Sequence, residues 1–372
     1  MHVAIDARLL HYTAGGIAHH TRNLALALAK AAPTDRFTLL RSIKQHGGRG
    51  LPTAANLHST PLLTPPHHRL EQLTLPLEVA RMRPDLLHCP DFIPPFVRSC
   101  PAVVTVHDVA FLRYPGTLTD ESRRYYGQVR RAVLRAERTI VVSEATARDL
   151  ADLLRLPTDR VRVIPNGLDP IYRRPADAAA TAHVRARWSL DRPYVMFLGT
   201  LEPRKDIPTL LRAFAAVRAR HPDLLLALVG RRGWLYEPIF AAIDALHLTD
   251  AVRTIKDAAD DDLPPLFDGA TAFAYPSLYE GFGLPPLEAL ARGVPSVVAD
   301  TSALPEVVGD AALLHPPGDH DALAGALLRL IEDEPLRATL RARGLIQAAR
   351  FTWERAAEQT LAVYYEAILM GR

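Results

Sequence analysis

Apolar positions follow two alternating patterns along this chain. Short, nearly continuous apolar runs predict strands of a covered parallel sheet, and the longer segments between them repeat apolar residues at helical spacing. In the first half the pattern predicts strands at residues 2–5, 37–40, 86–88, 103–107, 139–143 and 162–164, and a helix at about 17–31. In the second half it predicts strands at 194–199, 224–229, 252–255, 271–275 and 296–299, and helices at 207–220 and 236–246.

This alternation of strand and helix predicts an α/β fold with one doubly wound sheet in each half. Residues 169–193, which include an alanine-rich run, are expected to form the linker region. The last segment reads as an amphipathic helix whose aromatic side, with Tyr364 and Tyr365, needs a groove that the first domain would supply. We therefore expect a first domain of residues 1–172 with the returning helix 353–372, and a second domain of residues 173–352.

Composition narrows the class of protein. A chain of 372 residues that is 48% hydrophobic can bury two large cores. Cys89 and Cys100 are its two cysteines, so no disulfide framework is implied and a reducing compartment is expected. Neither a secretory leader nor a long spanning apolar stretch is evident, and we expect a soluble, cytoplasmic protein.

Charge is unevenly distributed. Residues 1–170 carry 22 Lys and Arg against 15 Asp and Glu, a net charge of +7, whereas residues 171–372 carry 22 against 26, a net charge of −4. The densest basic segment, residues 123–138, has helical periodicity, which is compatible with peripheral contact to the inner face of an anionic plasma membrane or with a solvated helix face. No recognised nucleic-acid motif accompanies the charge, so nucleic acid is not an expected partner.

The most informative chemistry lies in residues 274–290, where an apolar strand meets a helix through a glycine-rich loop. Gly281 and Gly283 allow close approach of the backbone to a ligand, and the prolines that follow suit a helix start whose amides are unsatisfied. Glu280 lies in the loop and Glu288 about one turn into the helix, so both could accept hydroxyls of a sugar or ribose. The plainer alternatives are a solvated loop charge and a carboxylate that complements the helix dipole.

Taken with other motifs in order, these two glutamates, with seven residues between them, resemble the retaining glycosyltransferases of family 4, in the GT-B group. The similar motifs are Gly15-Gly16, Val106-His107-Asp108, Val142-Ser143-Glu144, Ile164-Pro165-Asn166-Gly167, residues 199–206, and residues 302–309. The resemblance covers nearly the whole chain and is closest to bacterial mannosyltransferases. It implies two Rossmann-like domains that face a central cleft.

The resemblance also implies roles for individual residues. The catalytic set is His107, Glu280, Arg204 and Lys205, and the nucleotide-sugar-binding set is Gly15, Gly16, Gly281, Phe282, Gly283, Leu284 and Glu288. Arg204 and Lys205 stand between a strand and a helix start, where cations and amides suit a diphosphate; a solvated pair on a turn is the alternative. His107 would support the donor sugar rather than act as a simple base, unless it is an ordinary core histidine.

The implied reaction is transfer of a hexosyl group with retained anomeric configuration, without cofactor or metal. GDP-mannose is the expected donor, with a UDP- or dTDP-sugar as the alternative, and the expected acceptor is a glycan or lipid-linked glycan that contacts the segment 46–75. Asp260, Asp261 and Asp262 are expected to cap a helix rather than hold a metal, and the histidine pairs at 19–20 and 67–68 lack the companions of a zinc site.

Three other classes stay open. An oxidoreductase with a doubly wound fold would show a G-x-G-x-x-G turn, which Gly15-Gly16 does not provide. A non-catalytic protein that binds sugar nucleotides would keep Glu288 and the cations but lose sugar-facing residues. A GT-B epimerase would release nucleotide without a sugar acceptor.

Overall fold

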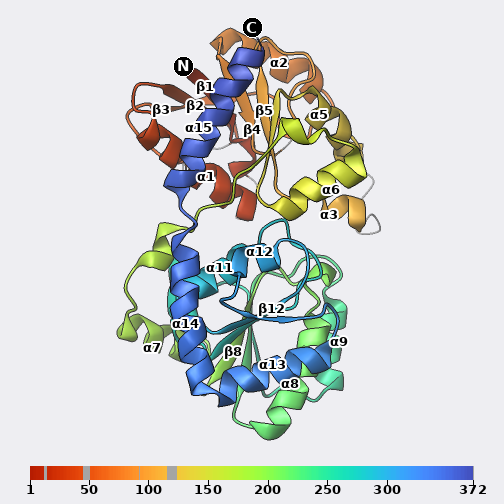
Figure 1. Cartoon of the computed structure of the whole chain (residues 1–372), viewed down its shortest axis with the longest axis vertical. Helices are drawn as coiled ribbons and strands as arrows, with labels where there is room; N and C mark the ends of the chain where they lie inside the picture. The colour runs from red at the N-terminus through yellow and green to blue at the C-terminus, as the bar shows by residue number, and fades with distance from the viewer. Residues whose placement is uncertain (12–14, 45–50, 92, 115–123, 372) are drawn as a thin grey trace. The chain divides into compact units, whose positions relative to one another are not determined.

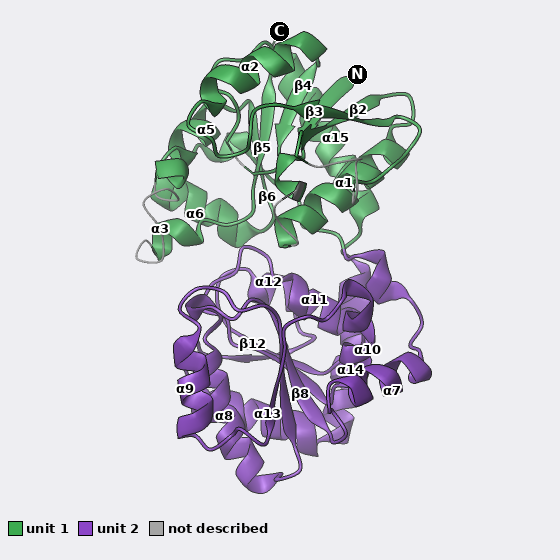
Figure 2. Cartoon of the chain, turned by 180° about the vertical axis from the view of Figure 1, so that it is seen from behind, with its two compact units in different colours: residues 1–167, 351–372 green, residues 168–350 purple. Residues whose placement is uncertain are grey.

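The computed structural model describes residues 1–11, 15–44, 51–91, 93–114 and 124–371 (Figure 1). The chain divides into two compact units, unit 1 (Met1–Gly167 and Phe351–Arg372) and unit 2 (Leu168–Arg350), coloured separately in Figure 2. Residues 168–172, which we assigned to the first domain, therefore belong to unit 2. None of the helices in the described ranges is long and apolar enough to cross a membrane.

Unit 1 is built on a parallel sheet with strand order β3-β2-β1-β4-β5-β6-β7. Its strands are β1 (His2–Asp6), β2 (Arg36–Ser42), β3 (Leu57–Leu62), β4 (Leu86–Cys89), β5 (Ala102–Val106), β6 (Arg138–Val141) and β7 (Val161–Val163). Every residue of β4 and β5 is buried, because helices cover both faces of the sheet. The strand order reverses between β1 and β4, which is the topological switch point where ligands of such sheets bind.

The helical segments of unit 1 pack on the two faces of this sheet. They are η1 (Arg8–His11), α1 (Gly16–Ala31), α2 (Glu71–Met82), α3 (Ala110–Arg113), α5 (Val129–Arg135), α6 (Glu144–Leu154), η4 (Thr158–Arg160) and α15 (Trp353–Met370). The C-terminal helix α15 lies along α1 (Figure 1) and contributes Trp353 and Tyr364 to the core on that face. The neighbouring Tyr365 is 52% exposed, so the aromatic side of α15 is only partly covered.

Unit 2 repeats the architecture with a sheet of order β10-β9-β8-β11-β12-β13, also parallel. Its strands are β8 (Tyr194–Leu198), β9 (Leu225–Val229), β10 (Val252–Ile255), β11 (Ala272–Tyr275), β12 (Ser296–Ala299) and β13 (Leu313–His315). Its helical segments are η5 (Pro170–Arg173), α7 (Ala178–Arg187), η6 (Pro203–Lys205), α8 (Ile207–Arg220), α9 (Glu237–Ala245), η7 (Asp260–Asp262), α10 (Leu263–Asp268), α11 (Leu284–Ala291), α12 (Leu304–Val308), α13 (His320–Glu332) and α14 (Glu334–Ala349). Here the switch point lies between β8 and β11.

The predicted α/β class and its two doubly wound sheets are confirmed, but two segments expected to be irregular are not. The segment 46–75 contains β3 and the start of α2. The linker region 169–193 contains α7, a helix of unit 2 that begins where the Asp177 carboxylate accepts hydrogen bonds from two backbone amides. Both elements carry few buried apolar residues, so their sequences lack the apolar runs that marked the other elements.

Candidate functional site

Two loops leave the carboxyl ends of β8 and β11 at the switch point of unit 2. The loop after β8 carries Arg204 and Lys205 on η6, and the loop after β11 carries Glu280. This second loop ends at Gly283, which has a φ of 108° and where an added Cβ would lie 2.8 Å from the Leu304 Cδ2 atom. Glycine is therefore required at this position to let the chain enter α11.

The Glu280 carboxylate is the centre of the site and is only 9% exposed. Its Oε1 atom accepts hydrogen bonds from the Ser277 hydroxyl at 2.6 Å, from the Tyr275 hydroxyl at 3.0 Å and from Lys205 Nζ. Its Oε2 atom lies 3.1 Å from Arg204 Nη1. The structure thus brings together three of the four residues predicted to be catalytic.

These cations keep Glu280 ionised. Burial alone would raise the pKa of this carboxyl, but Lys205 and Arg204 outweigh burial and lower the pKa to about 2. At neutral pH the site therefore holds a buried carboxylate against a buried ammonium group. Removing either member would leave the other charge unpaired, which is strongly destabilising.

A second carboxylate, Glu202, orients the Arg204 guanidinium and was missed from the sequence. Glu202 Oε1 accepts from Arg204 Nη2 at 2.8 Å and from Nε at 3.1 Å, while the Tyr279 carbonyl accepts from Nη1 at 2.6 Å. Burial raises the pKa of Glu202, although Arg204 opposes that shift. The signal was present, because Glu202 stands two residues before Arg204 within a motif already singled out.

The Glu288 carboxylate lies on α11 and receives a hydrogen bond from the Tyr172 hydroxyl, on η5. Burial raises the pKa of Tyr172, and Glu288 raises it further, so this phenol stays protonated and donates to the carboxylate. Tyr172 also packs edge-on against Phe267, with ring centroids 6.0 Å apart. Sequence analysis placed Tyr172 in the first domain and gave it no role, because nothing local in its sequence marks a contact with a residue so far along the chain.

The loop before α11 presents mostly backbone. Gly281, Phe282 and Gly283 are buried, Leu284 is half-buried, and no side chain caps the first turn of the helix. Phe282 is 6% exposed, so its ring belongs to the core of unit 2. Any nucleotide contact from these residues would therefore come from their main chain.

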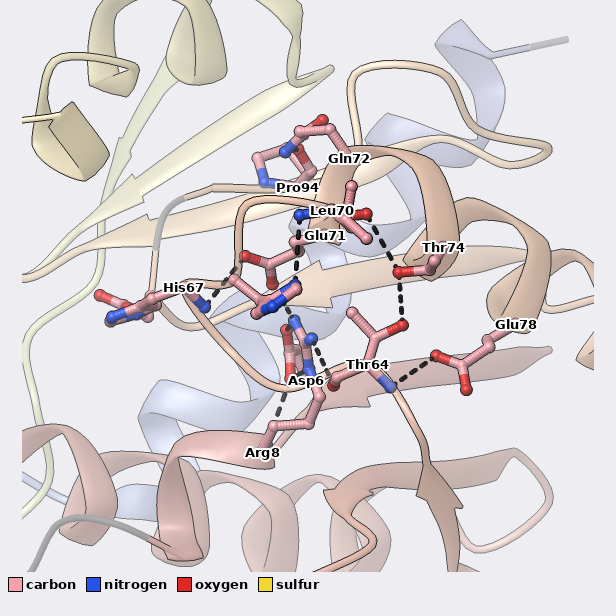
Figure 3. A network of polar contacts seen from close by, with 12 residues as sticks. Asp6, Arg8, Thr64, His67, Leu70, Glu71, Gln72, Thr74, Glu78 and Pro94 are labelled. Carbon is pink, nitrogen blue, oxygen red and sulfur yellow. Dashed lines mark hydrogen bonds and ion pairs between the residues drawn. The ribbon is translucent and has the colours of Figure 1, made fainter. Parts of the chain in front are cut away.

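In unit 1, the switch point between β1 and β4 opens into a small hollow. The residues lining it are Asp6, Ala7, Leu9, Leu10, Ile17, Ala18, Thr21, Pro90 and Asp91. Beside it, the Arg8 guanidinium is 1% exposed and binds Asp6 through Nε at 2.8 Å and Nη2 at 2.6 Å (Figure 3). Arg8 also pairs with Glu71 and donates to the Thr64 carbonyl at 3.1 Å, which fixes the start of α2 to the end of β1.

The rim of this hollow carries a histidine and a tyrosine. His67 Nε2 lies 2.8 Å from Asp91 Oδ2, and the His67 ring packs on Tyr125 with centroids 3.8 Å apart. The Tyr125 hydroxyl donates to the same carboxylate at 3.2 Å. This polar network was not predicted from the sequence, where His67 was considered only as half of a histidine pair.

His107 directly follows β5, as predicted; the residue is half-buried, and its Nε2 atom is buried. Burial lowers the pKa of His107 to about 4, despite a hydrogen bond to the Pro90 carbonyl. Nε2 has no hydrogen-bond partner among the described residues, so Nδ1 is the donor to Pro90 and Nε2 is left as an acceptor. A neutral ring of this kind can accept a hydroxyl hydrogen but is a weak general base at neutral pH.

His20 on α1 packs edge-on against His107, with ring centroids 4.6 Å apart, and was given no role from the sequence. Its Nδ1 lies 2.8 Å from Asn166 Oδ1, and burial lowers the pKa of His20 to about 3. Asn166 is therefore held inside unit 1. Gly167 follows it, and an added Cβ there would lie 2.4 Å from the Trp353 backbone nitrogen.

Gly15 and Gly16 open α1 without a side-chain cap. A Cβ added at Gly15 would meet nothing within 4 Å among the described residues. Contacts with the described residues therefore do not require a glycine at position 15. Residues 12–14, immediately before it, lie outside the described part of the chain.

Two of the three acidic residues considered as metal ligands pair with arginines. Asp260, Asp261 and Asp262 form η7, with Asp261 paired to Arg174 and Asp262 to Arg187. Across the described residues, no group of three or more histidine, cysteine or acidic side chains is arranged to hold a metal ion. Asp108, a candidate partner of His107, accepts from the Ala110 amide at 2.9 Å at the start of α3.

Comparison with known proteins decides the family. Residues 14–172 match the model described as Glycosyltransferase Family 4, and residues 180–346 match Glycosyl transferases group 1. The chain is 30% identical to O-antigen chain mannosyltransferase B of Escherichia coli, over 98% of this chain and 99% of that protein. It is a family 4 glycosyltransferase. The resemblance noted from the motifs is thereby confirmed.

Solved structures confirm the GT-B fold of this glycosyltransferase. Sucrose-phosphate synthase from Thermosynechococcus elongatus superposes with a TM-score of 0.81 at 22% identity, covering the whole of both chains. HepE from Anabaena, in complex with UDP-glucose, superposes with a TM-score of 0.75 at 21% identity, covering 98% of this chain and 100% of that chain. At such identities the likeness concerns the fold and not the substrate.

Proposed function

We propose that this glycosyltransferase moves a mannosyl group from GDP-mannose to a hydroxyl of a glycan or lipid-linked glycan, with retained anomeric configuration and without a metal. The observation that carries the proposal is the cluster of Arg204, Lys205 and Glu280 at the switch point of unit 2. Two cations at the end of a parallel sheet suit the diphosphate of a sugar nucleotide. The choice of mannose rests on the similarity to a mannosyltransferase over nearly the full length of both chains.

In this proposal, the leaving diphosphate is stabilised electrostatically, and such stabilisation commonly lowers the barrier of an enzymatic reaction more than any other effect. Arg204 is 20% exposed and can meet a phosphate directly, whereas Lys205 is 8% exposed and would have to leave its contact with Glu280 to do so. As the phosphates take over these cations, Glu280 becomes free to accept hydroxyls of the transferred sugar. Glu288, oriented by Tyr172, accepts the hydroxyls of the ribose.

In this proposal, residues of unit 1 contact the transferred sugar and bind the acceptor. His107 presents Nε2 as an acceptor for a hydroxyl of the transferred sugar, and its low pKa argues against a role as general base. With no separate base assigned, the departing phosphate oxygen takes the proton of the acceptor hydroxyl as the new glycosidic bond forms on the same face of the sugar. The acceptor approaches unit 1 at the carboxyl end of its sheet, where the Asp91 carboxylate lines the hollow.

Thermal shift with GDP, UDP, dTDP and ADP tests the donor, because a ligand raises stability with the logarithm of its excess over the dissociation constant. A shift confined to GDP supports the mannosyl donor. A shift with UDP or dTDP alone would mean that the donor is a UDP- or dTDP-sugar, and the assignment as a glycosyltransferase would stand. No shift with any nucleotide contradicts the proposal.

A turnover assay then separates transfer from the other classes. Release of GDP from GDP-mannose that requires a sugar acceptor supports a transferase, whereas release without acceptor favours an epimerase and binding without release favours a non-catalytic protein. NMR of the product reports whether the anomeric configuration is retained. Unchanged turnover in a chelator supports metal independence, and lost turnover contradicts it.

A further inference from the structure

Helix α2 of unit 1 has two apolar sides. One side is buried in the core and includes Leu75 and Val79. The opposite side carries Leu73 and Leu77, which are 68% and 65% exposed. The outward side of a surface helix is normally polar, so these leucines are unexplained by the folding of unit 1.

The exposed apolar side extends beyond the helix. Leu70 precedes α2 and is 51% exposed, and Leu63 follows β3 and is 72% exposed. The Leu63 backbone amide donates to Glu78 Oε1 at 2.7 Å, which holds the chain at Leu63 against α2; Figure 3 shows Leu70, Thr64 and Glu78 in this arrangement. We call Leu63, Leu70, Leu73 and Leu77 the leucine surface. Clustered exposed apolar residues of this kind mark interaction sites.

Exposed cations flank the leucine surface. Arg69 lies before α2, and Arg81 and Arg83 lie at its end, all exposed. Among nearby acids, Glu78 is occupied by backbone amides at residues 63 and 64, and Asp85 accepts from the His2 amide. An apolar helix side with basic residues around it is the pattern of elements that lie in the headgroup region of an anionic membrane.

The leucine surface adjoins the hollow of unit 1. Leu70 precedes Glu71, the first residue of α2, and Glu71 pairs with Arg8, which binds Asp6 at the edge of the hollow. We propose that the leucine surface docks this glycosyltransferase onto an anionic lipid bilayer, so that a lipid-linked acceptor can keep its lipid in the bilayer while its glycan reaches unit 1. The statement about the acceptor rests on the proposed function, whereas the docking does not.

The structure favours α2 over the segment 123–138, which the sequence singled out for membrane contact. Val129 and Val133 on α5 are buried in the core of unit 1, so the apolar side of this segment is already covered. Arg131 lies 4.3 Å from the centroid of the Phe96 ring, and Arg135 Nη1 donates to the Phe96 carbonyl. A second copy of the chain is a poorer occupant of the leucine surface, because a symmetric contact would bring identical arginines together.

Vesicle flotation of the full chain tests the docking. We expect binding to vesicles of phosphatidylcholine mixed with phosphatidylglycerol, weakened by salt and absent with phosphatidylcholine alone. Leu73→Gln/Leu77→Gln should weaken binding at least about tenfold, because two exposed apolar side chains no longer enter the bilayer. Arg69→Gln/Arg81→Gln should weaken it by a smaller factor and reduce its salt dependence.

The matched control is Leu345→Gln/Ile346→Gln on α14 of unit 2, where two apolar side chains are 49% and 71% exposed. It should bind vesicles like the unaltered protein, and an unchanged melting temperature should show that each variant is folded. Absence of vesicle binding, or full binding by Leu73→Gln/Leu77→Gln, overturns the proposal. So does a dimer in sedimentation equilibrium that this double variant dissociates, because a second copy would then occupy the surface.

A parallel measurement separates this proposal from the proposed function. The nucleotide-induced thermal shift measures nucleotide binding, which we assign to unit 2. It should be the same in Leu73→Gln/Leu77→Gln and in the unaltered protein. Vesicle binding without any nucleotide shift would refute the proposed function and support docking. A nucleotide shift without vesicle binding would refute docking and leave the transferase intact.

Discussion

The two units share one sheet topology but differ in the balance of charges at their switch points. In unit 1, the Asp6 and Glu71 carboxylates bind a single guanidinium, Arg8, while a third carboxylate, Asp91, pairs with His67. In unit 2, two cations face two carboxylates, which leaves the cluster neutral before any ligand binds. Carboxylates therefore outnumber the cation at the first edge, whereas the charges balance at the second.

The arginines of the two clusters also differ in the exposed fraction of their side chains. Every guanidinium nitrogen of Arg8 and of Arg204 binds the protein, but the Arg8 side chain is only 1% exposed, so it serves the structure of unit 1. The Arg204 side chain is 20% exposed and lies at the end of a turn. Similar chemistry in equivalent places thus has different uses: a buried cation fixes a loop, and a partly exposed cation can meet a ligand.

Breaking the unit 2 cluster should have the largest effect. Glu280→Gln removes the charge that pairs with Lys205 and the acceptor proposed for the sugar, so transfer should fall by a factor on the order of 10²–10³. Nucleoside diphosphate affinity should be kept or increased, since Arg204 and Lys205 lose a competing carboxylate. Steady-state kinetics with GDP-mannose and thermal shift with GDP measure the two effects.

The control for this experiment is Glu306→Gln, an acidic residue in the first turn of α12 that has no role in the proposed reaction. Its transfer rate should stay close to that of the unaltered protein. Transfer by Glu280→Gln at the unaltered rate would remove Glu280 from the catalytic set.

Breaking the unit 1 cluster should also cost stability, and no direct part in transfer is assigned to this cluster. Arg8→Met leaves Asp6 and Glu71 buried without their cation, which should lower the free energy of unfolding by about 3–5 kcal/mol. Replacing Trp188 and Trp234 by phenylalanine leaves Trp353 as the single tryptophan, whose fluorescence then reports unit 1 during denaturant unfolding.

The matched control is Arg162→Gln, because Arg162 and its partner Glu366 are 35% and 38% exposed in the same unit. Losing this surface pair should cost less than about 1 kcal/mol. If Arg8→Met costs no more than Arg162→Gln, the Arg8 network does not hold unit 1 together.

The same comparison explains which elements the sequence could predict. Strand β9 is buried at every position and reads as an apolar run, so it was located to within a residue. Strand β3 is an edge strand with its two end leucines buried and mostly exposed residues between them, and β13 has only three residues of mixed burial. Such strands have no periodic signature that separates them from loops.

The charged residues of the two clusters also differ in whether their contacts could be predicted from the sequence. Arg204, Lys205 and Glu280 were predicted because each lies in a motif of neighbouring residues, and the structure brings them into contact. The pair formed by Arg8 and Glu71 spans 63 positions, and no local pattern marks a partner at that distance. The sequence therefore shows which charged residues are present but does not predict which of them pair across distant segments.

Acid should destabilise unit 1 by protonating three of its histidines. We expect this effect to be smaller than those of Glu280→Gln and Arg8→Met. Burial lowers the pKa of His20 and His88 to about 3 and that of His107 to about 4. Their folded pKa values lie below the unfolded value of about 6.5, so the unfolded state binds more protons in between. Their contribution to stability is therefore complete above about pH 6.5 and is lost as pH falls toward the folded pKa values.

As the pH falls from about 7 to about 5.5, protonation of each of these histidines should lower the free energy of unfolding of unit 1 by about 1 kcal/mol. Trp353 fluorescence during denaturant unfolding measures this change. Glu280 in unit 2 behaves differently, since its pKa is lowered to about 2 and its contribution is lost only below the usual glutamate range. His20→Phe should make the pH dependence of unit 1 shallower by the share of one histidine. An unchanged slope in that variant would mean that His20 is already protonated, or solvated, in the folded protein.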